Sequence, residues 1–370
     1  MDVRLSAEQR ALRDSAVQLV GRLGATTVAG LDDEERRAKL DAAVDAAGWR
    51  DLRTGTDDGT PWASAVEVAI VAEELARGVA DTPFLGPTLA ADLRRRAGAA
   101  PTAALETIAL TADLADLASL DSGDEASADG PDDPATREQA VSSAVHAPTG
   151  RPGAAVAIDA AGSTTALVLL PGDDSRAIGV VDLEPAEVRA DLTRSMAAIV
   201  AGATPRPLAG AITDDDLTAW TALGLAVTCA DLVGSMRGAL DLATAYATER
   251  QQYGRPVGSF QAVQHLLADA LVAMEGSRSA TLHAAWAVDA LSPADALAAV
   301  AVAKAWCARA ARSVCETSIQ VHGGIGNTWE CLAHVHLRRA LLSTDVLGGT
   351  GPSLARVLDH HEIGAGDGLR

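Results

Sequence analysis

The chain has 370 residues, of which 48% are hydrophobic and only 3% aromatic, and its formal net charge at pH 7 is −20. A chain of this length can bury a core of two or three packed units, which must be built here mainly from Ala, Leu and Val. The negative charge argues against nonspecific nucleic-acid binding, because neutralising phosphates needs a basic face.

The cysteines and the first residues indicate the compartment. Cys229, Cys307, Cys315 and Cys331 form no C-x-x-C pair, so we expect buried thiols in a reducing cytoplasm. The N-terminus has no apolar signal-peptide core, and no uncharged stretch reaches the length of a membrane span. We therefore expect a cytoplasmic protein without a membrane span.

The first hundred residues predict helices. Ser6 is placed as the N-cap of "AEQRALRDSAVQLV", with Gln9 in the capping-box position. A second helix is expected over "DDEERRAKLDAAVDAAGW", which has apolar residues at helical spacing. Thr60 and Pro61 are expected to cap and open the helix "TPWASAVEVAIVAEELARG", and a short helix is expected after Gly86–Pro87.

Residues 105–211 predict a reduced β-domain. The runs "ETIALTADL", "GAAVAIDAA", "TTALVLLPG" and "AIGVVDL" are short and apolar, with turn signals between them. The acidic segment "DSGDEASADGPDDPATREQ", rich in Gly, Pro and Ser, lies between the first two runs. We expect it to form a mobile loop because it has little to bury.

Residues 212–370 predict a bundle of four long helices. Asp214–Asp216 suit the start of the first helix, and the second resumes at Ser259 or Phe260. The third is capped by Ser292 and ends at Gly323, and the fourth covers "ECLAHVHLRRALLSTDVL". With a helical domain over residues 1–104, the predicted fold class is mainly α with a small β-domain.

Two segments interrupt the bundle with polar residues and glycine turns, "ERQQYGRPVGSFQAVQHLLAD" and "IQVHGGIGNTWE". In this order they resemble two characteristic segments of the acyl-CoA dehydrogenase family. Two weaker likenesses accompany them: "AEELARGVADTPFLGPTLA" is similar to the end of that family's N-terminal helical domain, and "DLTR" lies where the family leaves its middle β-domain. The resemblance covers nearly the whole chain.

The resemblance implies a dimer, or a dimer of dimers, with FAD bound across the subunit interface. It implies that Arg250 pairs with the FAD pyrophosphate, a role that suits a planar guanidinium. Gln252 and Tyr253 would line the same channel. The second segment would add Gln320 and the turn Gly323–Gly324, where backbone without a Cβ can approach the dinucleotide closely.

Three histidines suggest no metal site. We expect His322 to pack in the interior. His334 and His336 are two residues apart on a helix, so they point to different faces and make a poor metal pair.

The resemblance fails at the catalytic base. The family removes the acyl α-proton with a glutamate, which many members carry in a Glu-Gly-Thr segment after the fourth bundle helix. This chain reads "STDVLGGTGPS" there, which puts Leu347 or Gly348 at the position. Other members carry the glutamate near the position of Gly224. We assign no catalytic residue, and Asp345 is the nearest acid.

The β-domain departs from the family as well. Its Thr-Glu-Pro-x-x-Gly-Ser-Asp-like segment holds the isoalloxazine ring, whereas this chain reads "IALTADLADLASLDSGDEAS" and continues into the acidic loop. Both departures affect the half-site for the chain's own flavin. The segments offered across the interface are intact.

These observations favour a subunit of a heteromeric acyl-CoA dehydrogenase. A homologous partner would supply the glutamate and the β-domain contacts to FAD, with a fatty or steroid side-chain acyl-CoA as substrate and an electron-transfer flavoprotein as acceptor. Two alternatives stay open: a complete homo-oligomeric enzyme with a displaced base, and a flavin-free structural paralogue.

Overall fold

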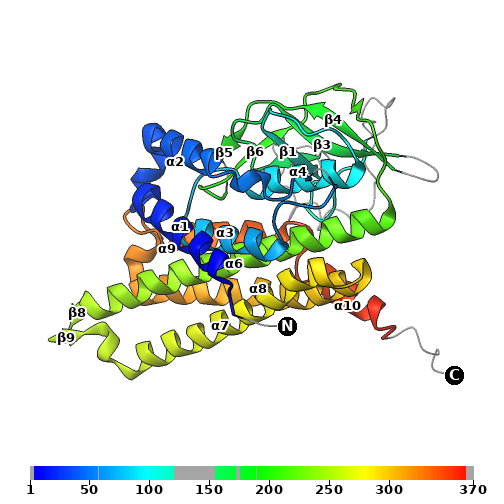
Figure 1. Ribbon diagram of the computed structural model, residues 1–370. Helices are drawn as coiled ribbons and strands as arrows, with labels where there is room; N and C mark the ends of the chain where they lie inside the picture. The colour runs from blue at the N-terminus through cyan, green and yellow to red at the C-terminus, as the bar shows by residue number, and fades with distance from the viewer. Residues whose placement is uncertain (1–3, 57, 121–154, 172–175, 189, 364–370) are drawn as a thin grey trace, which may run out of the picture.

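The computed structural model describes residues 4–363 except 57, 121–154, 172–175 and 189. Figure 1 shows helices of the first hundred residues beside a sheet, with a layer of long helices below both. The predicted fold class, mainly α with a small β-domain, is confirmed. The expected acidic loop lies outside the described residues, and the domain boundaries after residues 104 and 211 stay predictions.

The N-terminal helices are α1 (Ala7–Leu23), α2 (Glu34–Ala46), α3 (Ala65–Arg77) and α4 (Leu85–Ala97). The capping box that opens α1 is confirmed: the Gln9 backbone N–H donates to Ser6 Oγ, and the Ser6 N–H donates to Gln9 Oε1.

The predicted start of α3 was wrong by four residues. Thr60 and Pro61 lie in a turn closed by the Thr56 N–H donating to the Thr60 carbonyl, and α3 begins after Ser64. The N–H of Ala65, at the first position of the helix, donates to Asp289 Oδ2 at 2.6 Å. The Ser64 N–H also donates to Glu67 Oε2, so a local Ser-x-x-Glu capping box and an acceptor 224 residues away together satisfy this end of the helix.

The start of α4 also differs, because Gly86 and Pro87 lie inside its first turn. A Cβ at Gly86 would lie 2.1 Å from Thr107 Oγ1 and 2.7 Å from the Ile158 carbonyl oxygen. Glycine thus lets the helix pack directly on the neighbouring strands.

The sheet has the strand order β5-β6-β2-β1-β3-β4-β7 among the described residues. The four predicted runs form β1 (Glu106–Leu110), β2 (Val156–Ile158), β3 (Thr165–Leu170) and β4 (Ala177–Asp182). Three short strands were not predicted: β5 (Glu187–Val188), β6 (Ser195–Ala198) and β7 (Arg206–Pro207). Only the β1–β3 pair is parallel.

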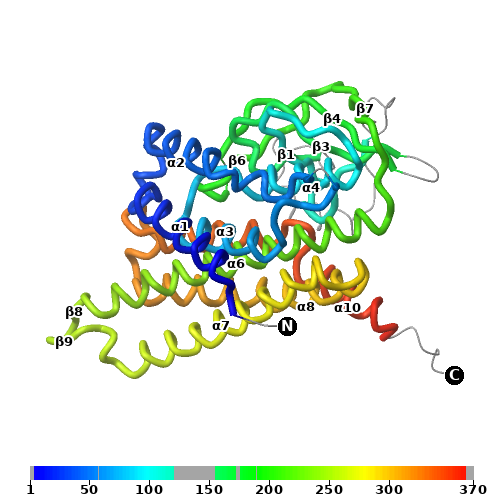
Figure 2. The backbone as a smooth tube through the Cα atoms, viewed as in Figure 1, coloured from blue at the N-terminus to red at the C-terminus, as the bar shows by residue number. Residues whose placement is uncertain are grey.

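The bundle helices are α6 (Asp214–Glu249), α7 (Gln261–Ala290), α8 (Pro293–His322), α9 (Ala333–Asp345) and α10 (Thr350–His360). The predicted N-terminal signals of α6 and α8 are confirmed, and α10 was not predicted. The tube in Figure 2 shows α6 running beneath the first helices and above α7 and α8. A hydrogen bond from Trp220 Nε1 to the Leu89 carbonyl, 2.9 Å, fixes α6 against α4.

The core is aliphatic, as the composition predicted, and all four cysteines are buried free thiols. Within the described residues one helix, α6, is long and apolar enough to cross a membrane. However, 83% of its most apolar window is buried inside the protein, which is typical of a central core helix.

Candidate functional site

The β8–β9 hairpin presents Arg250, Gln252 and Tyr253 at one end of the bundle. After α6 ends, Gln251–Gln252 (β8) pairs with Arg255–Pro256 (β9). Arg250 is anchored through its backbone, since its N–H donates to Tyr246 O and its carbonyl accepts from the Val257 N–H. Its side chain is exposed and forms no hydrogen bond or ion pair within the described residues.

Tyr253 occupies a strained position at the tip of this hairpin. Tyr253 and Gly254 form the turn with φ of 53° and 78°, the geometry of a type I′ turn. Such a φ is unfavourable for a bulky side chain, and Tyr253 is 93% exposed. Its ring meets Phe260 edge-on at 6.3 Å, and Arg255 stacks on Phe260 at 4.3 Å. The hairpin therefore holds a preorganised aromatic and cationic surface outside the core.

The second predicted segment lies at the same end. Gln320 is exposed in the last turn of α8, and Gly323 follows with φ 66°. Nothing lies within 4 Å of the position that a Cβ would take at Gly323 or Gly324. The rings of Tyr246 on α6 and His322 on α8 are 4.6 Å apart, so the structure brings both segments together.

His322 packs in the interior as predicted, with Nδ1 at 2.7 Å from the Ser318 carbonyl oxygen. His334 and His336 are both buried. In the part of the chain that the structure describes, no three His, Cys, Asp or Glu residues are grouped so as to hold a metal ion.

The two positions expected for a catalytic base meet each other in the interior. Leu347 is 1% exposed, and its Cδ1 lies 2.2 Å from where a Cβ on Gly224 would be, with Leu89 on the other side. The Leu347 N–H donates to the Leu114 carbonyl at 2.7 Å. Leu114 belongs to the segment after β1 that departs from the family's ring-holding segment. Leucine side chains and a backbone hydrogen bond thus fill the two positions at which the family carries its base.

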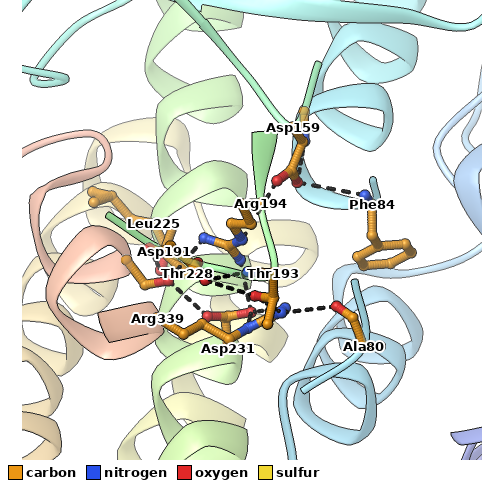
Figure 3. A network of polar contacts seen from close by, with 12 residues as sticks. Ala80, Phe84, Asp159, Asp191, Thr193, Arg194, Leu225, Thr228, Asp231 and Arg339 are labelled. Carbon is orange, nitrogen blue, oxygen red and sulfur yellow. Dashed lines mark hydrogen bonds and ion pairs between the residues drawn. The ribbon is translucent and has the colours of Figure 1, made fainter. Parts of the chain in front are cut away.

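A buried ionic network fills the adjoining space between sheet and bundle (Figure 3). Asp231 on α6 accepts hydrogen bonds from Arg194 Nη2 at 2.7 Å and from Arg339 Nη2 at 2.7 Å. Ser343 Oγ donates to its other oxygen at 2.6 Å. Arg194 also lies 3.4 Å from Asp159, which accepts from the backbone N–H of Phe84 and of Gly86.

The pKa values of the two buried aspartates Asp231 and Asp191 are shifted in opposite directions. Burial acts to raise the pKa of Asp231, but Arg194 and Arg339 outweigh it and hold that pKa below the usual value. Burial does raise the pKa of Asp191, more than the two arginines lower it. The carboxylate of Asp231 is therefore ionised and fully engaged.

Little space is left around Asp231. The cavity lined by Phe84, Asp159, Arg194, Asp231 and Arg339 has a volume of about 10 Å³. That is at the lower limit for one water molecule. On their other side, Asp159 and Arg194 border an open cavity of about 400 Å³ beside β6, and a second open cavity of about 380 Å³ lies along α4.

Comparisons with known proteins were made for sequence and for structure. Residues 222–358 match the family described as acyl-CoA dehydrogenase, C-terminal domain. Acyl-CoA dehydrogenase FadE34 of Mycobacterium tuberculosis is 44% identical over 135 residues, 36% of this chain and 19% of that protein. Acyl-CoA dehydrogenase IpdE2 of Mycolicibacterium smegmatis is 35% identical over 167 residues, 45% of this chain and 49% of that protein. Over residues 222–358 the chain is therefore similar to the C-terminal domain of the acyl-CoA dehydrogenase family.

The matches span half or less of these relatives' own length. Solved structures extend the likeness in fold to the whole chain. The ChsE4-ChsE5 complex from Mycobacterium tuberculosis gives a TM-score of 0.68 with 22% identity, covering 98% of this chain and 99% of that chain. A variant of the Tcur3481-Tcur3483 steroid ACAD gives 0.73 with 23% identity, covering 97% and 98%.

Lys304 is a buried residue of the bundle that the sequence did not single out. Its ammonium donates to Thr228 Oγ1 at 3.1 Å and to the carbonyls of Ser343 and Val346 at 2.6 and 3.0 Å. Burial lowers its pKa to about 8, an effect that nearby acidic groups oppose. The composition could have pointed to Lys304, because it is one of only two lysines in the chain and lies inside an apolar helix. Lys304 fixes the end of α9 that leads to Leu347.

The half-buried Asp345 lies in the last turn of α9. Its charge favours the protonated form of Lys304, so it already stabilises a buried cation.

We predict that replacing Asp231 destabilises the fold strongly. Asp231→Asn leaves Arg194 and Arg339 without their shared carboxylate, and breaking a buried pair on one side costs about 3–5 kcal/mol. Urea unfolding of the purified chain measures the loss. Asp182→Asn breaks the exposed pair with Arg206 (52% and 56% exposed) and should cost less than about 1 kcal/mol. Equal losses in the two variants would contradict a structural role for the network.

We also predict a histidine-linked loss of stability in acid. Burial, with a smaller contribution from Arg339, lowers the pKa of His336 from 6.5 to about 3. The unfolded chain takes up this proton near pH 6.5 and the folded chain does not, so stability falls as the pH drops from about 6.5 towards 3. In His336→Leu this loss should be smaller by up to about 1.4 kcal/mol per pH unit.

Urea unfolding at several pH values between 7 and 4 tests this expectation. His361→Gln removes an exposed histidine after α10 and should leave the profile unchanged. Parallel pH profiles for the unmodified chain and His336→Leu would show that His336 is not the group responsible.

Proposed function

We propose that this chain is one subunit of a heteromeric, FAD-dependent acyl-CoA dehydrogenase that introduces an α,β double bond into an acyl-CoA thioester. A homologous partner supplies the catalytic glutamate and the β-domain contacts to FAD. The observation that carries the proposal is the packing of Leu347 between Gly224 and Leu114. Both base positions are closed by apolar contacts, while the outer end of the bundle is open.

The residues at the outer end of the bundle and those in the interior differ in how well they fit FAD. At the outer end, an exposed guanidinium that has no side-chain partner among the described residues and an open glycine turn suit a pyrophosphate and its ribose. In the interior, a ring system would have to displace the Leu114–Leu347 contact and the network around Asp231. When bound, FAD accepts the hydride from the substrate β-carbon. Arg250, Gln320 and Gly324 would hold and orient the dinucleotide.

Neither interior acid suits the role of base. Asp231 is held ionised by two arginines, so its affinity for a proton is low. Asp345 stabilises Lys304. A general base must reach the substrate proton and gain it readily, and neither carboxylate is free to do so. This argues against a complete homo-oligomeric enzyme with a displaced base.

One rigid helix separates the two half-sites. Gly224 and Arg250 are about 39 Å apart at a rise of about 1.5 Å per residue along α6. This is longer than an extended flavin dinucleotide, so Arg250 would contact a flavin whose ring lies in another subunit.

The known structures support a heteromer. The ChsE4-ChsE5 structure is titled as a complex of two different proteins, and the Tcur3481-Tcur3483 structure is titled a steroid ACAD. Another chain of similar fold is titled electron transferring flavoprotein of Acidaminococcus fermentans. From these we propose the CoA thioester of a steroid side chain or a fatty acid as substrate, and an electron-transfer flavoprotein as acceptor, in the cytoplasm.

Co-expression with a homologous subunit that carries the glutamate tests the proposal. We expect this chain alone to be colourless and the complex to be yellow, with about one FAD per pair of chains and acyl-CoA dehydrogenase activity. Visible absorption at the flavin band and an acyl-CoA oxidation assay measure both. A purified chain that alone binds stoichiometric FAD and oxidises an acyl-CoA would overturn the proposal.

A second test concerns the contribution of this chain to the shared site. Arg250→Ala should lower the FAD content of the complex by about tenfold or more, because a charge-assisted contact to the pyrophosphate contributes about 1.5–3 kcal/mol. Arg312→Ala, on the exposed surface of α8, is the matched control and should retain FAD. A complex with unchanged flavin in Arg250→Ala would favour the flavin-free structural paralogue instead.

A further inference from the structure

Trp329 is an exposed aromatic residue that the predicted site does not include. It follows the 3-10 turn Gly323–Asn327 (η4) and precedes α9, and it is 67% exposed. Indole rings are normally largely buried, because their apolar area is large. Trp62 and Trp306 are also exposed, at 71% and 53%, so the position of Trp329 directly after the predicted dinucleotide segment is what distinguishes it.

The ring is held in place rather than free to rotate. The imidazole of His334 on the first turn of α9 meets it edge-to-face, with ring centroids 5.6 Å apart. His334 is itself buried. The turn beneath is closed by Thr328 and Cys331, whose backbone N–H groups donate to the carbonyls of Ile325 and Thr328. A fixed aromatic face loses little entropy when a flat partner stacks on it.

Trp329 lies at the same end of the bundle as the proposed dinucleotide contacts. Cys331, two residues further on, interacts with the His322 side chain, and the His322 ring packs against Tyr246 at 4.6 Å. Tyr246 lies one helical turn before Arg250. In Figure 1 the turn after α8 and the β8–β9 hairpin lie at one end of the molecule.

We propose that Trp329 is the stacking platform for the adenine ring of the FAD that the partner subunit holds. This proposal rests on the proposed function. A purine needs an apolar face beside hydrogen-bonding groups for its edge, and Trp329 follows the open Gly323–Gly324 turn by five residues, at the end of α8 that carries the exposed Gln320. The alternative is that Trp329 is the centre of a protein–protein interface. Such a residue is normally surrounded by others that exclude water, but its neighbours Asn327, Thr328 and Glu330 are all exposed.

Comparing FAD with FMN tests the proposal, because FMN carries the same ring system without adenine. The reconstituted complex is stripped of flavin and titrated with each, and binding is followed by flavin fluorescence. Trp329→Ala should weaken FAD binding by about 5- to 150-fold, the range for one base stacked on an aromatic ring, and leave FMN binding unchanged. Trp329→Phe should keep most of the FAD affinity.

Trp306→Ala is the matched control, since Trp306 is 53% exposed in the middle of α8, away from the turn. Equal effects of Trp329→Ala on FAD and FMN, or none on either, would overturn the adenine assignment. Loss of assembly in Trp329→Ala, measured by size-exclusion chromatography, would show a protein contact instead and would also overturn it. If the unmodified complex binds neither flavin, or if Arg250→Ala has no effect, the proposed function itself fails.

Discussion

The carboxylate of Asp231 is the interaction on which the arrangement of the three layers depends. It binds Arg194 at the start of β6 and Arg339 and Ser343 on α9, while Arg194 reaches Asp159 and through it the first turn of α4. Two guanidiniums can be buried here only because a shared anion and several hydrogen bonds offset their desolvation. N-terminal helices, sheet and bundle therefore meet at one charged centre, and little space is left beside Asp231.

Two residues with a positive φ show how the packed interior differs from the exposed outer end of the bundle. In the interior, Leu347 takes a positive φ of 59°, costly for a leucine, yet packing and the hydrogen bond to Leu114 hold it there. At the outer end Tyr253 takes a similar φ in the type I′ turn of the hairpin, where its ring contacts Phe260 and is otherwise 93% exposed. Packing in the core compensates the cost at Leu347. At Tyr253 the pairing of β8 with β9 sets the turn, and the side chain stays available to a ligand or a partner.

Local signals predicted much of the fold, and long-range contacts decided the rest. Capping residues gave the starts of α1, α6 and α8 because those ends are satisfied by their own side chains. The start of α3 has a Ser64–Glu67 capping box, which the prediction passed over in favour of Thr60 and Pro61, and its first N–H is bound by the distant Asp289. Short strands such as β5 and β7 have too few residues for a periodicity to show.

Part of the candidate site could likewise be predicted from local sequence, and part of it depends on long-range contacts. Motif residues in two short segments could be found by inspection, and the bundle brought them to one end because α6 and α8 pack side by side. The roles assigned to Arg250, Gln252, Tyr253, Gln320, Gly323 and Gly324 stay predictions. The ionic network could not be found, because Asp159, Arg194, Asp231 and Arg339 come from different elements. A missing glutamate was visible in the sequence; that Leu347 and Gly224 fill its place together was not. The absence of a glutamate at these positions and the leucine packing are thus one feature of the structure, and this feature supports the proposal that a partner supplies the base.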